Sequence, residues 1–120
     1  MAGNETQGAS TTIFRRRFDE PDDEMPFEHG RSVVVALRGG EEVWRSELQP
    51  GWNWDEDLKP YADGATSCPL THREYVASGR IRYLMTDGTE LEATAGDVLF
   101  IPPGHRGWVL GEEPCVLIDW

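Results

Sequence analysis

The sequence predicts an all-β protein, a sandwich or barrel built from short strands. From Arg31 onward the chain is a succession of short apolar or alternating runs separated by Gly, Pro and Asp, which is typical of such folds. No long helical pattern and no internal repeat interrupts this series, so there is no room for the helices that connect parallel strands. A chain of 120 residues is long enough for one core but not for two.

The N-terminal part differs in composition from the rest. Residues 1–28 are rich in Gly, Pro, Ser, Thr and charges and show little periodicity, which predicts a flexible, poorly ordered arm before a barrel domain of residues 29–120. In that domain Val33–Leu37 is the first predicted strand, and the alternating run Glu42–Leu48 is the second. A helical turn is expected only in Asp55–Tyr61, where Pro60 should end it.

The C-terminal half carries the clearest strand signals. Arg80–Ala93 alternates on both sides of Asp87-Gly88, a pair that tolerates the positive φ of a tight hairpin turn. Val98–Ile101 is a buried strand that the following prolines stop, and a last hairpin is expected to join Trp108–Leu110 to Cys115–Asp119. So many short strands favour a closed or nearly closed barrel, which removes exposed edges.

Charge and hydropathy restrict the partners. The formal net charge of -11 argues against nucleic acid, because phosphate binding needs a basic face. The apolar runs are too short to span a bilayer, and the first residues lack the basic and apolar parts of a signal peptide. We therefore expect a cytoplasmic protein with no membrane or nucleic-acid partner, in which Cys68 and Cys115 stay reduced.

Two glycine-bounded segments, His72–Gly79 and Gly96–Gly107, carry a resemblance to a known family. The first ends in a Tyr-Val-x-x-Gly pattern, and the second places Pro102 six residues after its first glycine and Gly104 two residues later. This arrangement resembles the two conserved motifs of the cupins, over roughly residues 31–120. The resemblance implies a cupin-like jelly-roll β-barrel with a site in its mouth, and, since cupins often pair, a homodimer.

The resemblance also indicates where a metal site would lie. In cupins with the full pattern, two histidines and a glutamate of the first motif and a histidine of the second hold a metal. Those positions fall here on Thr66, Cys68, His72 and Gly107, so every usual ligand is replaced. The chain is similar to a subset of small cupins with a Cys in the first motif, a His at the glutamate position and Gly-His-Asp-x-Trp in the second. His105 stands two residues before Gly107 and shares its strand parity.

A thiolate and two imidazoles from Cys68, His72 and His105 would suit a divalent metal ion, zinc or iron(II), with a position left for water or substrate. The Cys-x3-His spacing fits a strand, where residues four apart face the same way. Glu74 shares the parity of His72 and is expected as a further ligand or as a group that orients a histidine. The plainer alternative is a buried apolar thiol and hydrogen-bonded interior histidines. Cys115 is expected in the core, and His29 on the surface without a partner.

Five residues are candidates for binding a small molecule: Trp52, Trp54, Arg73, Arg106 and Trp108. The indoles two residues apart would share one face of an extended segment and stack on a ligand, or else pack in the core. The two arginines flank the metal candidates and would pair with an anionic metabolite, particularly a carboxylate, or else with the abundant surface acids.

Three classes of function remain open at this point. The first is a metal-dependent enzyme acting on a small metabolite, in which the metal polarises a carbonyl or lowers the pKa of water. The second is a non-catalytic ligand-binding or regulatory cupin without metal, and the third is a structural domain with a vestigial site. Catalytic residues and the reaction stay unassigned.

Overall fold

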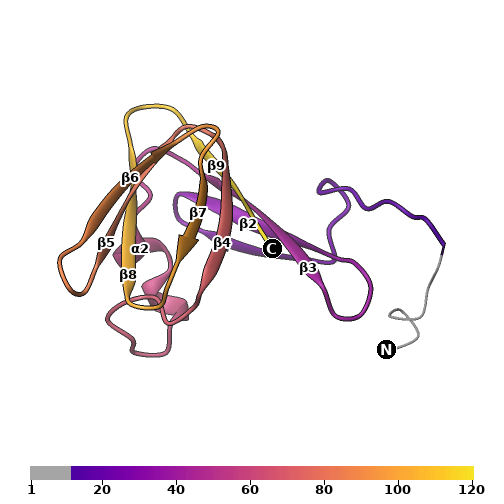
Figure 1. The fold of residues 1–120 in the computed structure, drawn as a ribbon, viewed down its shortest axis with the longest axis horizontal. Coiled ribbons are helices and arrows are strands. Elements are labelled where there is room, and N and C mark those ends of the chain that lie inside the picture. The colour runs from indigo at the N-terminus through magenta and orange to yellow at the C-terminus, as the bar shows by residue number, and fades with distance from the viewer. Residues whose placement is uncertain (1–11) are drawn as a thin grey trace.

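A computed structural model describes residues 12–120, which form two antiparallel β-sheets (Figure 1). The elements in chain order are β1 (Asp23–Phe27), β2 (Gly30–Ala36), β3 (Glu42–Leu48), α2 (Trp54–Asp57), the 3-10 turn η1 (Lys59–Tyr61), β4 (His72–Ser78), β5 (Arg80–Met85), β6 (Glu90–Thr94), β7 (Val98–Ile101), β8 (His105–Leu110) and β9 (Cys115–Asp119). The all-β prediction is confirmed.

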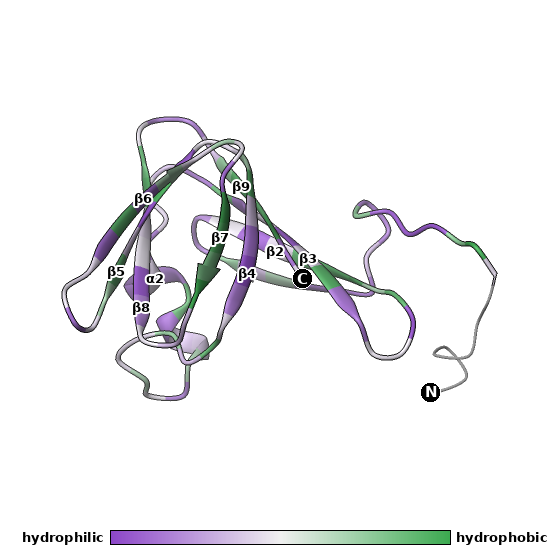
Figure 2. Cartoon of the chain, in the orientation of Figure 1, coloured by the Kyte–Doolittle hydropathy of each residue, from purple (hydrophilic) through white to green (hydrophobic). Residues whose placement is uncertain are grey.

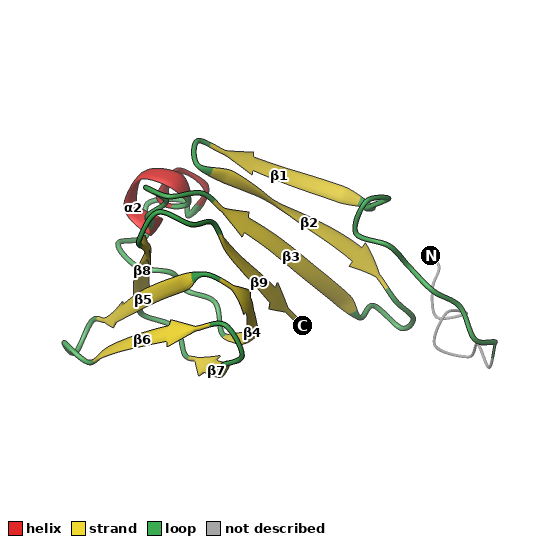
Figure 3. Ribbon diagram, turned by 90° about the horizontal axis from the view of Figure 1, so that it is seen from above, coloured by secondary structure: helices red, strands yellow, loops and turns green. Residues whose placement is uncertain are grey.

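One sheet has six strands in the order β1-β2-β3-β9-β4-β7, and the other has three in the order β6-β5-β8. Some strands that follow each other in the chain, such as β4 and β5, lie in different sheets, whereas others, such as β5 and β6, pair within one sheet. Figure 3 shows β1, β2, β3 and β9 as one continuous side, β5 and β6 on the other, and α2 at the end near the turn between β1 and β2. This interleaving encloses an interior between the sheets.

The predicted hairpin of residues 80–93 is present as β5 and β6. Leu84 pairs with Glu90, and Gly88 in the turn has φ 92°, a left-handed conformation that glycine adopts without strain. The predicted last hairpin is wrong. Strand β8 pairs with β5, whereas β9 pairs with β3 and β4, so residues 111–114 carry the chain from one sheet to the other. Alternation predicts that a segment is a strand, but burial against the interior decides its partner.

The N-terminal region is partly built into the sheet. Residues 1–11 lie outside the described part of the chain. Asp23–Phe27, expected within the arm, instead form β1, which pairs along its whole length with β2. Arg16 reaches the same sheet, because its guanidinium lies 2.9 Å from the Asp22 carboxylate and donates to the carbonyl of Ala36 at 2.7 Å. The boundary at residue 28 therefore falls inside a hairpin.

The expected helical turn divides into two. Asn53 caps α2, since its side chain accepts a hydrogen bond from the backbone N–H of Glu56 at 3.0 Å. Pro60 does not end a turn but lies in the first residues of η1, where its missing N–H has no helical partner to lose. These two short elements close one end of the interior.

The core lies between the two sheets. Val76 of β4, Ile81 of β5 and Cys115 of β9 are fully buried in it, which confirms the expectation for Cys115. Figure 2 shows β7 as hydrophobic, whereas the first residues of β4, its neighbour in the same sheet, are hydrophilic. In residues 12–120 no helix has the length and apolar character needed to cross a membrane.

Candidate metal site and adjoining cavity

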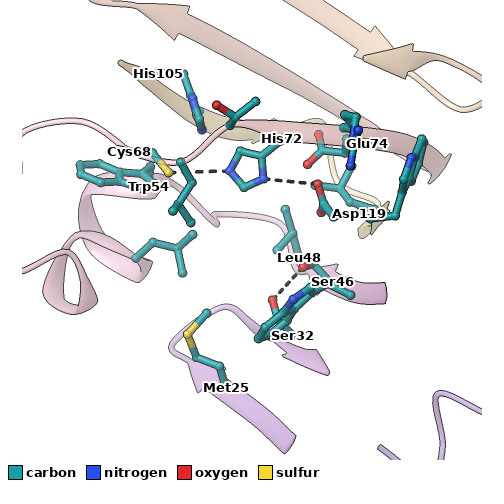
Figure 4. A pocket seen from close by; sticks show the side chains of 18 of the residues that line it. Met25, Ser32, Ser46, Leu48, Trp54, Cys68, His72, Glu74, His105 and Asp119 are labelled. Atoms are coloured by element: carbon teal, nitrogen blue, oxygen red, sulfur yellow. Dashed lines mark hydrogen bonds and ion pairs between the residues drawn. The ribbon is translucent and has the colours of Figure 1, made fainter. Parts of the chain in front are cut away.

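A cavity of about 490 Å³ lies between the sheets, within the usual range for small-molecule sites. Its walls are largely apolar and include several aromatic side chains, and one group of polar residues lies where β4 begins. Figure 4 shows these groups, Cys68, His72, His105, Glu74 and Asp119, with the hydrogen-bonded hydroxyls of Ser32 and Ser46 on the far side of Leu48.

Cys68, His72 and His105 converge at this end of the cavity. The Sγ of Cys68 lies 3.7 Å from Nε2 of His72, and one donor atom from each of the three residues lies within 4.8 Å of the others. The two imidazole rings meet edge to face with centroids 4.9 Å apart. The alternation along β8 buries His105 and Gly107 on the same inward face, as the sequence predicts.

Cys68 reaches the site by a different route from the one its spacing suggests. It precedes β4, so it does not share a strand with His72. Instead it forms an isolated bridge with His105: the N–H of Cys68 donates to the His105 carbonyl at 2.9 Å, and the N–H of Gly104 donates to the Cys68 carbonyl at 2.8 Å. Backbone pairing with β8, rather than strand parity, therefore sets the position of the thiol.

Both histidines are oriented by oxygen atoms behind them. The Nδ1 of His105 lies 2.8 Å from the carbonyl of Pro102, and because a carbonyl only accepts, this nitrogen carries the hydrogen. The Nδ1 of His72 lies 3.3 Å from Oδ1 of Asp119. In each ring Nε2 is then the nitrogen left for a metal ion, as in the carboxylate–histidine and carbonyl–histidine pairs that orient metal ligands in proteins.

The spacing of the donor atoms fits a tetrahedral metal ion. Zinc bonds to sulfur and to imidazole nitrogen at their usual lengths put the two donor atoms about 3.6 Å apart at a tetrahedral angle. The measured separation between Cys68 and His72 is 3.7 Å. One thiolate and two imidazoles are a donor set that suits zinc or iron(II) and leaves a coordination position open.

The ionisation of the site is set by these contacts. Burial alone would raise the pKa of the Cys68 thiol, but hydrogen bonds with His105 and His72 outweigh it and lower the pKa to about 6. Burial would also lower the pKa of His72, yet contacts with Asp119 and Cys68 raise it to about 10. Without a metal, the pair is therefore a thiolate beside an imidazolium near neutral pH.

A second polar group lies on the other side of His72. Glu74 is 2% exposed, and its carboxylate accepts a hydrogen bond from the hydroxyl of Tyr83 at 2.6 Å. Burial and the nearby charge of Asp119 raise the pKa of Glu74 to about 8. Glu74 groups with His72 and Asp119 rather than with Cys68 and His105, so the structure does not bring it to the same point as the other expected ligands.

The candidate ligand-binding residues separate into two sets. Trp52 and Trp54 are buried and line the cavity, and the exposed Arg73 contributes at its rim. Arg106 and Trp108 do not line this cavity, because β8 turns them away from the inward face of His105 and Gly107. Arg106 pairs instead with Asp55 at 2.9 Å, which is the surface salt bridge weighed as the alternative.

The surroundings of His29 differ from those predicted. It was expected on the surface without a partner, but its ring is only partly exposed, and its Nδ1 lies 3.0 Å from the buried carboxylate of Asp57. The backbone N–H of His29 donates to the same carboxylate at 2.7 Å, and that of Asn53 does so at 3.2 Å. The pair ties the turn between β1 and β2 to α2, although the two are far apart in the sequence.

Sequence reasoning missed Asp119 and Tyr83. Asp119 shares the strand parity of the buried Cys115 and Leu117 on β9, so a carboxylate at an inward position of an apolar strand was the available signal. Its Oδ1 is buried and has no hydrogen-bond partner among residues 12–120, apart from its ion-pair contact with His72. Tyr83 was identified as part of a strand, but its link to Glu74 depends on the packing of one sheet on the other.

Comparison with known proteins identifies the fold. No family model and no curated protein matches the sequence. Among solved structures, an oxalate decarboxylase from Lactobacillus farciminis, in a formate complex, superposes with a TM-score of 0.58 and 19% identity over 81% of this chain and 30% of its own. The chain thus spans less than a third of that enzyme.

Two shorter proteins are similar over most of their length. The polyketide cyclase RemF from Streptomyces resistomycificus has a TM-score of 0.63 and 16% identity over 90% of this chain and 78% of its own. A cupin-2 domain protein from Rhodospirillum rubrum has a TM-score of 0.61 and 15% identity over 90% of this chain and 73% of its own. Structural similarity at identities this low indicates a shared fold and does not indicate a shared activity. The chain is therefore a small domain with the cupin fold.

Proposed function

We propose that the chain binds one divalent metal ion, zinc or iron(II), through Cys68 Sγ and the Nε2 atoms of His72 and His105, and that it binds or acts on a small molecule in the adjoining cavity. The observation that carries this proposal is the orientation of the two imidazoles. Each turns Nδ1 to a protein oxygen, which leaves both Nε2 atoms available at the thiol. If the thiol and the two histidines were only buried interior groups that bind no metal, nothing would require both Nε2 atoms to be left free beside the sulfur.

A bound metal would supply Lewis acidity at the polar end of the cavity. The residues of this chain have separate tasks. Asp119 orients His72, the carbonyl of Pro102 orients His105, and Glu74 with Tyr83 holds a proton close to the site. The apolar side chains of the cavity border this end, and an apolar surrounding strengthens electrostatic interactions.

The test is the metal content of the full chain after chelation and reconstitution with zinc, or with iron(II) under anaerobic conditions. We expect one ion per chain in the wild type and a large loss in Cys68→Ser and His105→Asn. Cys115→Ala and His29→Asn are matched controls, since they remove the same residue types away from the site and should bind normally. Zinc should also raise the unfolding temperature of the wild type and of both controls, because it binds only the folded state.

Wild-type protein that takes up no stoichiometric metal and shows no zinc-dependent stabilisation would refute the proposal. The second candidate, a non-catalytic ligand-binding protein without metal, would then be favoured. One observation supports it: Cys68 and His72 form a thiolate–imidazolium pair whose charges balance without a metal ion. A homodimer and a cytoplasmic location stay predictions.

A further inference from the structure

We propose that a second copy of this chain packs against an exposed apolar patch on the outer face of β4, β7 and β9, and that a two-fold axis relates the two copies. This surface, called the β7 patch, is formed by Arg73, Tyr75, Val98, Phe100, Ile118 and Trp120. The inference goes beyond the proposed function, because it holds whether or not the cavity takes a metal ion. It gives the expected homodimer a surface that can be tested.

Backbone pairing places the residues of the β7 patch side by side. Tyr75 lies opposite Val98 on one side and opposite Ile118 on the other. One step along the same strands, Arg73 lies opposite Phe100. Side chains alternate along a strand, so these five lie on the face of the sheet opposite to the buried residues of β4. They therefore form one continuous surface outside the interior.

The β7 patch is exposed although it is apolar. Val98 is 67% exposed and Phe100 is 68% exposed. Tyr75 is 40% exposed, and Trp120, whose backbone N–H donates to the carbonyl of Arg73 at 3.2 Å, is 50% exposed. Strand β7 is the edge of its sheet and carries no charged residue, and Figure 2 shows it as hydrophobic. Because proteins protect or cover such edges, this one indicates a surface that another molecule covers.

The size of the patch matches the apolar part of a dimer interface. From the exposed fractions of its four most open residues, the patch offers roughly 400–500 Å² of accessible area. A standard interface buries about 800 Å² on each partner, and in homodimers about 65% of that area is apolar. In a two-fold dimer the same surface serves both copies. One β7 patch on each copy therefore supplies most of the apolar area that a stable dimer needs.

The charge of the patch also favours a second copy. The chain carries a formal net charge of -11, yet the six residues of the β7 patch include no carboxylate and only one arginine. The acidic groups that repel another copy therefore stay outside the contact. A guanidinium stacks well on an aromatic face, so Arg73 can lie on a ring of the partner. A basic partner would instead prefer the acids elsewhere on the surface.

The β7 patch adjoins the cavity. Arg73 and Trp120 belong to the patch and also line the cavity. A second copy bound to the patch therefore lies beside the rim of the cavity and contributes to it.

The experiment is sedimentation velocity of the full chain over a concentration series. We expect a dimer in the wild type, with a dissociation constant that falls between low salt and about 1 M sodium chloride, because salt screens the repulsion between two acidic copies. Phe100→Asp and Val98→Asp each place a carboxylate in the contact and should raise the dissociation constant at least about tenfold. Leu91→Asp is the matched control. It changes another exposed apolar residue, on β6 in the other sheet, and should leave the dimer unchanged.

Thermal unfolding shows whether each variant is folded, as expected for changes at exposed positions. Amide hydrogen exchange of the wild type at low and high concentration needs no variant, and residues 98–101 should be better protected in the concentrated sample. A wild type that stays monomeric at every concentration would overturn the proposal and leave a different protein as the occupant of the patch.

A dimer that persists in Phe100→Asp and Val98→Asp, or that is lost equally in Leu91→Asp, would place the interface on another surface and so overturn the proposal. A dimer that salt weakens would mean that ion pairs hold it, against the charge argument. None of these measurements depends on metal content. The failure of this inference and the failure of the proposed function are therefore distinguishable.

Discussion

Replacing His72 with asparagine should remove most of the stabilisation of the Cys68 thiolate in the metal-free protein. The Nε2 of His72 lies 3.7 Å from Sγ, and this contact, together with His105, lowers the pKa of the thiol from 9.0 to about 6 despite burial. Asparagine is shorter and carries no positive charge. The pKa of Cys68 in the variant should therefore move back toward 9.0, with His105 as the remaining imidazole beside the thiol.

The size of the effect follows from these two values. At pH 7.5 a thiol of pKa about 6 is about 97% ionised, whereas one of pKa 9.0 is about 3% ionised. With one of two imidazoles removed, we expect a pKa above about 7 and a clear loss of thiolate at pH 7.5. The folded state favours the thiolate, so its contribution to stability is present above pH 9.0 and is lost as the pH falls through about 6.

The assay is ultraviolet absorbance of the thiolate as a function of pH. Cys115 does not interfere, because burial and the charge of Glu74 raise its pKa to about 12, and Cys115→Ala in every sample makes the assignment unambiguous. His29→Asn serves as the control for loss of a histidine outside the site. The reasoning is refuted if the wild-type thiol titrates near 9.0, or if His72→Asn leaves its midpoint near 6.

Three further predictions concern groups around the site and the fold. Burial raises the pKa of Glu74 to about 8, so its protonated form contributes stability that is full below pH 4.5 and lost as the pH rises through about 8. In Glu74→Gln the free energy of unfolding in urea should therefore change less with pH over this window than in the wild type. Equal slopes of this free energy against pH in both proteins would contradict the prediction. The hydrogen bond to Asp57 raises the pKa of His29. The loss of unfolding temperature in His29→Asn should therefore be largest below pH 6.5 and should shrink as the pH rises. A loss that is the same at every pH would argue against the ion pair. Gly107→Ala would place a methyl group 2.9 Å from the Tyr83 ring and should cost about 1–3 kcal/mol in urea unfolding; an unchanged midpoint would mean that the ring yields freely.

The positions of the strands could be predicted from the sequence because they depend on local alternation of apolar and polar residues. Residues 80–93 follow the predicted course, since a period of two and a glycine at the turn are properties of short segments. Residues 98–101 form a strand as predicted, but the strand is not buried, because β7 lies at the edge of its sheet and exposes Val98 and Phe100. Which strands pair with each other could not be predicted in the same way. The segments 105–110 and 115–119 are adjacent in the chain yet lie in different sheets, because each buries its inward face against a different set of distant strands.

The candidate site shows the same division. Parity on β8 correctly grouped His105 with Gly107, but Cys68 and His72 do not share a strand, and their proximity comes from the backbone bridge between Cys68 and His105. Arg106 has the opposite parity to His105 on β8 and so lies outside the cavity.

The sequence by itself determined the fold class, the two motif segments and the residue types that could hold a metal, since these are written in local periodicity and composition. Only the tertiary structure decided which oxygens orient the two histidines, that Glu74 stands apart from the thiol, and that the indole N–H of Trp52 is buried without an acceptor among residues 12–120. Each of these depends on where strands from distant parts of the chain pack against one another. Side-chain contacts across a closed β-structure are set by pairing and sheet packing, which local sequence does not encode.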